Sequence, residues 1–324
     1  MALTMSCAFN TSLDSPEHAR IAEQLGYRTA WFYDSPALYA DVWVQLCRAA
    51  ERTERIRLGP GVLVPTLRHP MATAAAVSTL AAVAGAERVV VAVGSGFTGA
   101  FTLGQRPAKW SFVAAYVRTL RALLRGEQTE WDGAPIRMMQ YPGFGAERPI
   151  TVPVLIAAEG PKGMAVAREV GDGVFSASRP AAGFDWSAVL VCGTVLDDGE
   201  DPGSARVIAA AGHGAATRMH FATEFGLQDR LSIRPEWAAA YADVPAAERH
   251  LALHDGHMAL VNERDRPFVT GEVLTATGLA LTASATRDKL AALAEAGATE
   301  VAYQPAGPDV PRELEAFAEA VGAS

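Results

Sequence analysis

The sequence predicts an α/β chain that folds as one (β/α)8 TIM barrel with an insertion after its seventh strand. Short apolar segments alternate with helical patterns along most of the chain, and eight such segments can be counted. These segments are almost continuously apolar, which indicates strands covered on both faces in a parallel sheet. A doubly wound open sheet is the alternative, and the count of eight favours the barrel.

The expected elements follow one another in a regular order. Helix limits rest on signals such as Pro16 in the first turn and Gly26 or Gly85 directly after the last turn. The expected strands cover residues 3–9, 28–34, 56–64, 88–96, 154–158, 173–175, 188–196 and 300–304. The expected helices begin at residues 15, 41, 69, 112, 161, 286 and 312.

Two segments interrupt this alternation. TEWDGAPIRM, residues 129–138, predicts a small hairpin with Asp132 and Gly133 in its turn. The segment of about 200–285 has a helical pattern broken by Gly and Pro. We expect it to be an insertion that roofs the barrel mouth, within one domain that spans residues 1–324.

The composition limits the partners that the chain can have. Acidic residues outnumber basic ones, 36 to 28, for a net charge of -8. This balance argues against a nucleic-acid partner, which requires a basic surface, but leaves room for a small anionic ligand. No uninterrupted apolar run long enough for a membrane span and no signal peptide is visible, so we expect no membrane partner. Cys7, Cys47 and Cys192 are widely spaced, which suits reduced thiols in a cytoplasmic protein.

The turn after the fifth expected strand carries Glu159, Gly160, Pro161 and Lys162. Unpaired N–H groups at a helix N-terminus attract phosphate, and glycine lets a ligand approach the backbone. Lysine is rare here, with only Lys109, Lys162 and Lys289 in the chain. The turn therefore predicts a phosphate site, and an ordinary strand-to-helix turn is the alternative.

Two further strand ends have unusual glycine content. Gly94, Ser95 and Gly96 follow the fourth expected strand, where they leave room for a ligand or form a tight turn. The third strand contains GPGVLVP, residues 59–65, and glycine or proline inside a central strand indicates a bulge or a close approach to a ligand. An imperfect strand start is the plainer reading of that segment.

The segments AEQLGYRTAWFYD, ERIRLGPGVLVPTLRHP, RVVVAVGSG, AAEGPKGMAVAREVGDGVF and LAALAEAGATEVAYQPAG together resemble the bacterial-luciferase-like superfamily of flavin-dependent barrels. The likeness is greatest to the branch that uses coenzyme F420, such as methylenetetrahydromethanopterin reductase. It implies a non-prolyl cis peptide at Gly61-Val62 that supports the central ring of the cofactor, with Asp34 near the ring. It also implies that Ser95, Gly96 and the turn from Gly160 to Lys162 receive the phosphorylated side chain.

The resemblance leaves the choice of cofactor open between F420, which we favour, and FMN. The acidic tail of F420 calls for a basic rim, for which Arg68, Arg179 and Lys162 are candidates. Several F420-dependent relatives have a histidine after the aspartate of the second strand, whereas this chain has Ser35. That difference implies another substrate or another proton donor.

Three histidines, His250, His254 and His257, fall within a narrow arc if their segment is one helix. His254 and His257, with Asp34, are our candidates for catalytic residues, because histidine exchanges protons near neutral pH. Hydrogen-bonded histidines in a helix interface are the structural alternative. No carboxylates accompany them at metal-ligand spacing, so we expect no metal site. His69 is expected to cap the third helix or to face the ring.

The expected activity is hydride transfer between F420 and a C=C, C=N or C=O bond of a small molecule. An FMN-dependent monooxygenase and a non-catalytic flavin-binding relative are the alternatives. A phosphosugar lyase or isomerase would need a lysine or paired carboxylates at strand ends, and the sequence offers no convincing set. The resemblance further implies a homodimer.

Overall fold

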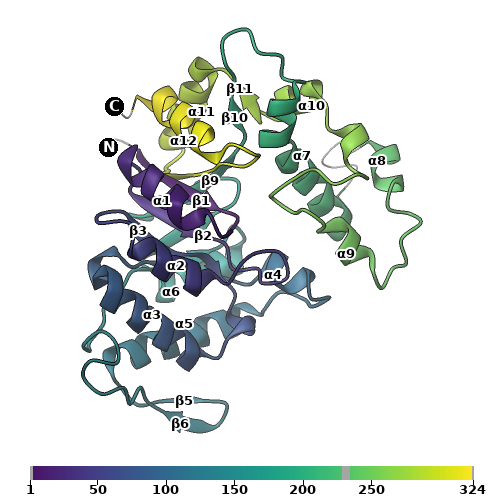
Figure 1. The fold of residues 1–324 in the computed structure, drawn as a ribbon. Coiled ribbons are helices and arrows are strands. Elements are labelled where there is room, and N and C mark those ends of the chain that lie inside the picture. The colour runs from purple at the N-terminus through teal and green to yellow at the C-terminus, as the bar shows by residue number, and fades with distance from the viewer. Residues whose placement is uncertain (1–2, 228–233, 323–324) are drawn as a thin grey trace. The chain divides into compact units, whose positions relative to one another are not determined.

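The computed structural model describes residues 3–227 and 234–322, and its central feature is a closed barrel of eight strands (Figure 1). Neighbouring strands from β1 to β9 pair in parallel, which confirms the predicted (β/α)8 barrel. In their order around the barrel the strands are β1 Thr4–Phe9, β12 Glu300–Gln304, β9 Ser187–Cys192, β8 Gly173–Ser176, β7 Val154–Ala157, β4 Val91–Gly94, β3 Arg57–Leu63 and β2 Thr29–Phe32.

Helices cover the outside of these strands, each packed against the next, from α1 to α2, α3, α5 and α6. The apolar side chains on their inner faces meet strands that are buried on both sides. The bounds are α1 Ser15–Gln24, α2 Val42–Ala50, η1 Pro65–Leu67, α3 Pro70–Ala84, η2 Ala86–Arg88, α4 Phe97–Phe101, α5 Trp110–Arg125 and α6 Pro161–Val170. His69 is the N-cap of α3, where its Nδ1 accepts the Met71 N–H, which confirms the capping role.

The interior of the barrel holds a small apolar cluster built from alternate strand residues. Trp31 and Phe175 are its largest buried members and meet edge to face, with ring centroids 5.2 Å apart. Alanines from five strands fill the remaining space between them, namely Ala8, Ala92, Ala157, Ala188 and Ala302. These small residues leave room for the two aromatic rings, which accounts for the alanine-rich strand sequences.

A hairpin precedes β7, as the sequence predicts. Strands β5 Thr129–Trp131 and β6 Ala134–Ile136 pair antiparallel and lie beyond the end of α5 (Figure 1). Asp132 and Gly133 have φ of 50° and 76°, the two positive values that a type I′ turn requires.

The chain divides into two compact units, one of Met1–Val191 with Ala292–Ala302 and one of Cys192–Ala291 with Tyr303–Ser324. The second unit contains the predicted insertion after the seventh barrel strand, β9. Its two-stranded sheet, β10–β11, is parallel and was not anticipated from the sequence. The elements within it are β10 Thr194–Val195, α7 Ala205–Phe225, α8 Pro235–Ala239, α9 Arg249–Leu253, η3 Arg266–Phe268, α10 Gly271–Ala276, β11 Ala280–Leu281 and α12 Val310–Val321. Helix α11 Ala283–Glu295 begins in this unit and ends in the first.

Helix α7 is continuous through Gly212 and Gly214, although the sequence predicts that glycine interrupts this segment. A methyl group on Gly212 would lie 2.6 Å from Cγ2 of Val261, and one on Gly214 would lie 2.9 Å from Leu279 Cδ2. These glycines therefore serve as contact points for neighbouring segments rather than as helix breaks.

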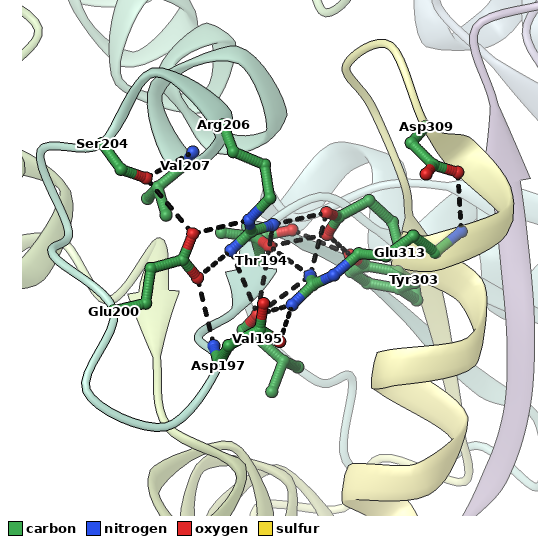
Figure 2. Close-up of polar contacts among 12 residues, drawn as sticks. Thr194, Val195, Asp197, Glu200, Ser204, Arg206, Val207, Tyr303, Asp309 and Glu313 are labelled. Atoms are coloured by element: carbon green, nitrogen blue, oxygen red, sulfur yellow. Dashed lines mark hydrogen bonds and ion pairs between the residues drawn. The ribbon is translucent and has the colours of Figure 1, made fainter.

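An ion-pair network joins β10, α7 and α12 within the second unit (Figure 2). The side chain of Glu313 is buried and contacts the guanidinium groups of Arg206, at 2.7 Å, and Arg312, at 3.0 Å. It also accepts a hydrogen bond from the Thr194 hydroxyl at 2.6 Å. Because its charge is paired and hydrogen-bonded, this carboxylate can remain buried.

Among the helices of residues 3–227 and 234–322, none has the length and hydrophobicity needed to cross a bilayer.

Candidate functional site

The strand ends singled out in the sequence lie on consecutive strands of the barrel. Strands β2, β3, β4, β7 and β8 are neighbours in that order, so their carboxyl ends form a continuous arc. In barrels of this kind the loops at that end carry the chemistry. The polar groups at this edge are therefore the candidate site of the first unit.

Strand β3 carries the expected bulge. Its pairing with β4 shifts between Gly61 and Leu63, which leaves Val62 as the extra residue. The Gly61-Val62 peptide is cis and not prolyl, as the resemblance implies. A methyl group on Gly61 would lie 2.8 Å from Cβ of Trp31, so the backbone of the bulge rests directly on the indole side chain.

The glycines after β4 are explained by this bulge. A methyl group on Gly94 would lie 2.8 Å from Val62 Cγ2, and one on Gly96 would lie 2.4 Å from Val64 Cγ1. Gly96 also has a φ of 86°, which glycine adopts without penalty. The position that a Cβ would take is thus filled by Val62 of β3 at Gly94 and by Val64, directly after β3, at Gly96. Ser95 between them is buried, and its carbonyl oxygen accepts the Ala108 N–H at 2.8 Å.

A depression beside Ser95 contains a lysine that the sequence analysis did not assign to the site. Thr66, Ala108, Lys109, Ser111 and Phe112 line it. Lys109 is the N-cap residue of α5. Lysine is rare in this arginine-rich chain, and that rarity is the one sequence signal that points to Lys109.

Asp34 is at the end of β2 and forms an ion pair with Arg68. Nη1 of Arg68 lies 2.7 Å from Oδ1 and 2.6 Å from Oδ2, and the Asp34 side chain is 1% exposed. The Val64 N–H also points at Oδ2, at 3.4 Å. Burial raises the pKa of Asp34, and the Arg68 charge opposes that rise. Arg68, a candidate for the rim that binds an acidic tail, is therefore engaged with Asp34 and, through Nη2, with Asp41 at 3.1 Å.

The turn after β7 contains a hydrogen-bonded residue, Glu159, and a glycine with open space beside it, Gly160. Glu159 accepts hydrogen bonds from the N–H and hydroxyl of Ser178, at 2.7 and 2.9 Å, and so links the β7 and β8 ends. Gly160 is the N-cap of α6, with φ -91° and ψ 160°, and no atom lies within 4 Å of a methyl group placed on it. Pro161 occupies the first turn, where a missing N–H leaves no bond unmade.

Lys162 is exposed in the first turn of α6 and forms no ion pair within the part of the chain that the structure describes. The next residue, Gly163, has a different role from Gly160. A methyl group there would lie 2.5 Å from Trp110 Cζ2 and 2.7 Å from Ala158 Cβ, so this glycine allows α6 to pack. The ring of Trp110 thus packs against the first turn of α6.

The histidines belong to the second unit and do not share one helix, which corrects the sequence prediction. Helix α9 ends at Leu253, so only His250 lies within it. His254 caps it, and His257 follows in a turn where Gly256 and Met258 have positive φ. The two side chains nevertheless meet, since their Nδ1 atoms are 3.2 Å apart.

Two histidines of α7, which the sequence analysis did not single out, complete a buried cluster with this pair. The His220 ring stacks on His257 with centroids 6.1 Å apart, and its Nε2 lies 2.8 Å from Oδ2 of Asp265. His213 lies two helical turns before His220 on the same face of α7 and is fully buried. Their spacing of seven residues on a helix is the signal that could have revealed them.

Burial keeps the rings of His213, His254 and His257 neutral near pH 7. It lowers the pKa of His213 and of His254 to about 4, and lowers that of His257 further. Because their Nδ1 atoms face each other, one ring of the His254–His257 pair donates the proton that the other accepts. Within the described residues, no group of three or more His, Cys, Asp or Glu side chains is arranged to hold a metal ion.

Comparison with known proteins places this geometry in context. The family model described as luciferase-like monooxygenase matches residues 13–300. The 5,10-methylenetetrahydromethanopterin reductase of Archaeoglobus fulgidus is 26% identical over 321 residues, which cover 92% of this chain and 91% of the relative. The F420-dependent glucose-6-phosphate dehydrogenase of Beutenbergia cavernae is 35% identical over 141 residues, 40% of each chain.

Solved structures share the fold at low sequence identity. The coenzyme F420-dependent tetrahydromethanopterin reductase of Methanopyrus kandleri superposes with a TM-score of 0.67 at 20% identity, over 98% of both chains. An oxygenating component of 3,6-diketocamphane monooxygenase from Pseudomonas putida, in complex with FMN, gives 0.62 at 13% identity, over 99% of this chain and 98% of that one.

Proposed function

Because the chain belongs to the luciferase-like monooxygenase family, we propose that it is an oxidoreductase that uses coenzyme F420 to transfer a hydride to or from a small organic substrate. The relatives named as an F420-dependent dehydrogenase and as a reductase of this branch support the choice of cofactor. The observation that carries the proposal is the bulge of β3 at the barrel mouth, flanked by an open helix N-terminus.

The residues present fit a phosphorylated deazaflavin. Val62 is the bulge residue and is only partly buried, so its backbone can support a flat ring. Gly160 leaves the first N–H groups of α6 open to an approaching phosphate, and Lys162 adds an ammonium that has no ion pair among the described residues. Lys109 supplies a second cation at the same edge, beside Ser95. We assign the phosphorylated side chain to this edge and the acidic tail to Lys109, Lys162 and Arg179.

When bound, the deazaflavin would supply the hydride chemistry, while the protein orients the reactants and sets the local charge. The Asp34–Arg68 pair would hold a fixed charge distribution beside the ring, because its salt bridge leaves neither group free to exchange protons readily. His254 and His257 remain our candidates for proton exchange with the substrate. Because both rings are neutral near pH 7, the pair would pass a proton along its shared hydrogen bond and would not hold a charge.

A turnover assay tests this function. Purified protein with reduced F420 and a panel of ketones, imines and activated alkenes is expected to reoxidise the cofactor, followed by its visible absorbance. Alcohols with oxidised F420 test the reverse direction. Formation of an oxygenated product from a substrate with reduced FMN and O2, and no F420 turnover, would instead identify an FMN monooxygenase.

That monooxygenase is the second candidate, favoured by the family description and by the likeness to an FMN-bound fold. Cofactor binding without turnover of any substrate would indicate a non-catalytic flavin-binding relative.

We further propose that the protein is a cytoplasmic homodimer. We also propose that the chain is a single functional domain whose insertion roofs the barrel mouth. Size-exclusion chromatography with light scattering checks the dimer.

A further inference from the structure

A buried carboxylate lies at the opposite end of the barrel from the candidate site. Glu300 is the first residue of β12, and its side chain is almost completely buried. An isolated ionised carboxylate is expensive to bury, so its partners define what it does. Neither the strand-end chemistry nor the proposed cofactor site uses it.

Each oxygen of Glu300 accepts one indole N–H. Nε1 of Trp31 lies 2.9 Å from Oε1, and Nε1 of Trp186 lies 2.8 Å from Oε2. The guanidinium of Arg57 stacks on the Trp186 ring, 5.4 Å from its centroid. Glu300 thus fixes two indoles at once, from β2 and from the segment before β9.

Trp31 connects this carboxylate to the bulge of β3. Its indole nitrogen is held by Glu300, while its Cβ, Cγ and Cε3 face Gly61, each within 3.2 Å of a methyl group placed there. Trp31 is fully buried, and the Phe175 ring packs against it edge to face. A side chain held at one end and packed at the other transmits a displacement instead of absorbing it.

We infer that Glu300 is a positioning residue for the β3 bulge that would support the cofactor ring. It acts through the Trp31 indole on the backbone at Gly61 and Val62. The inference rests on the proposed function for its consequence in cofactor binding, but not for its structural step. A purely structural role, in which Glu300 only closes the base of the barrel, is the competing account.

The amide variant E300Q separates these accounts, because both indole N–H groups need an acceptor and compete for its single oxygen. Gln has one acceptor oxygen, so its NH2 group must face one of the two indole N–H groups. Adding W186F removes that conflict and lets the amide oxygen accept the Trp31 N–H again. W186F alone is the matched control, since it leaves the Trp31–Glu300 bond in place.

Hydrogen-exchange mass spectrometry of the cofactor-free proteins is the first readout. We expect faster exchange in the peptide covering residues 57–68 in E300Q, and exchange like that of W186F in the E300Q/W186F protein. F420 titration is the second readout, with Kd raised roughly tenfold in E300Q, as expected when a buried donor loses its acceptor, and restored in the double variant.

Unchanged exchange at residues 57–68 in a destabilised E300Q protein would overturn the inference, as would failure of W186F to restore either readout. If E300Q does not fold, W31F/E300Q tests the same connection from its other end, and normal exchange at 57–68 there also contradicts it. A wild-type protein that binds no F420 would refute the proposed function, while the exchange results would still decide the role of Glu300.

Discussion

At the scale of single residues, the glycines of the site divide into two kinds. Gly61, Gly94, Gly96 and Gly163 let chain segments approach, because an added methyl group would collide with a neighbour in each case. Gly160 alone faces open space and has an ordinary extended conformation. The approach of a ligand is therefore expected at Gly160, and loss of stability at the others.

The variant G160D tests the phosphate site at this residue. Asp is a favoured N-cap and should keep or raise stability, but its charge would repel a bound phosphate. We expect Kd for F420 to rise roughly tenfold or more, since like charges about 4 Å apart near a protein surface repel by about 1 to 4 kcal/mol. G160N has the same shape without the charge and should bind nearly as wild type; equal losses in both variants would contradict the assignment.

Removal of the Arg68 guanidinium tests the ion pair. R68M leaves the buried Asp34 carboxylate unpaired, which is expected to cost about 3 kcal/mol of unfolding free energy, measured by urea denaturation. The D34N/R68M protein should regain most of that loss, because no uncompensated charge remains. A stability of R68M equal to wild type would show that the pair is not important to the fold.

At the scale of elements, the order of strands and helices was predictable, because the buried strands of a parallel barrel are apolar segments that alternate with capped helices. The β3 bulge was predictable from glycine and proline in a central strand, and the hairpin from Asp132-Gly133. The short α9 was not predictable, because the helix ends at Leu253, before Gly256 gives a sequence signal for a break. The continuity of α7 was also missed, because tight packing and helix breaking both select glycine.

The variant G212A tests this packing role of α7. Alanine favours a helix by about 1 kcal/mol over glycine. Its methyl group would however lie 2.6 Å from Val261, and such overpacking costs about 1 to 3 kcal/mol. We expect net destabilisation in chemical denaturation, and a favourable coupling energy with V261A in a double-mutant cycle. A stabilised G212A protein would show that the helix accommodates the methyl group.

At the scale of the whole molecule, the chemistry is distributed over two compact units. Backbone and cations at the barrel edge form the candidate cofactor site, whereas the buried histidines belong to the other unit. The sequence could suggest both sets, but it did not reveal their partners. Arg68, Asp265 and the histidines of α7 are distant in sequence from the groups they contact, and no local pattern records such contacts.

The second unit should be sensitive to acid. His213 and His254 have pKa values of about 4 in the folded chain, below the usual 6.5. Between these two pH values the unfolded chain therefore binds protons at these histidines that the folded chain does not bind. Stability is therefore complete above about pH 6.5 and is lost as the pH falls towards 4, by about 1.4 kcal/mol per pH unit for each histidine. The nearby carboxylates are Asp265, paired with His220, and Glu224, 3.9 Å from Nε2 of His254.

Hydrogen exchange in peptides of α7 at pH 7 and pH 5 measures this effect. Exchange corrected for its intrinsic rate should quicken at pH 5, and H213L should show a shallower pH dependence by one proton. An unaltered slope in H213L would place the sensitivity elsewhere.

The central claim, that the β3 bulge and the α6 N-terminus hold a phosphorylated deazaflavin, is tested most directly by an equilibrium titration of the cofactor-free protein with F420 and with FMN, followed by fluorescence. We expect saturable F420 binding at one site per chain, weaker FMN binding, and displacement of either cofactor by the other. Tight binding of FMN with none of F420, or binding of neither, would contradict it.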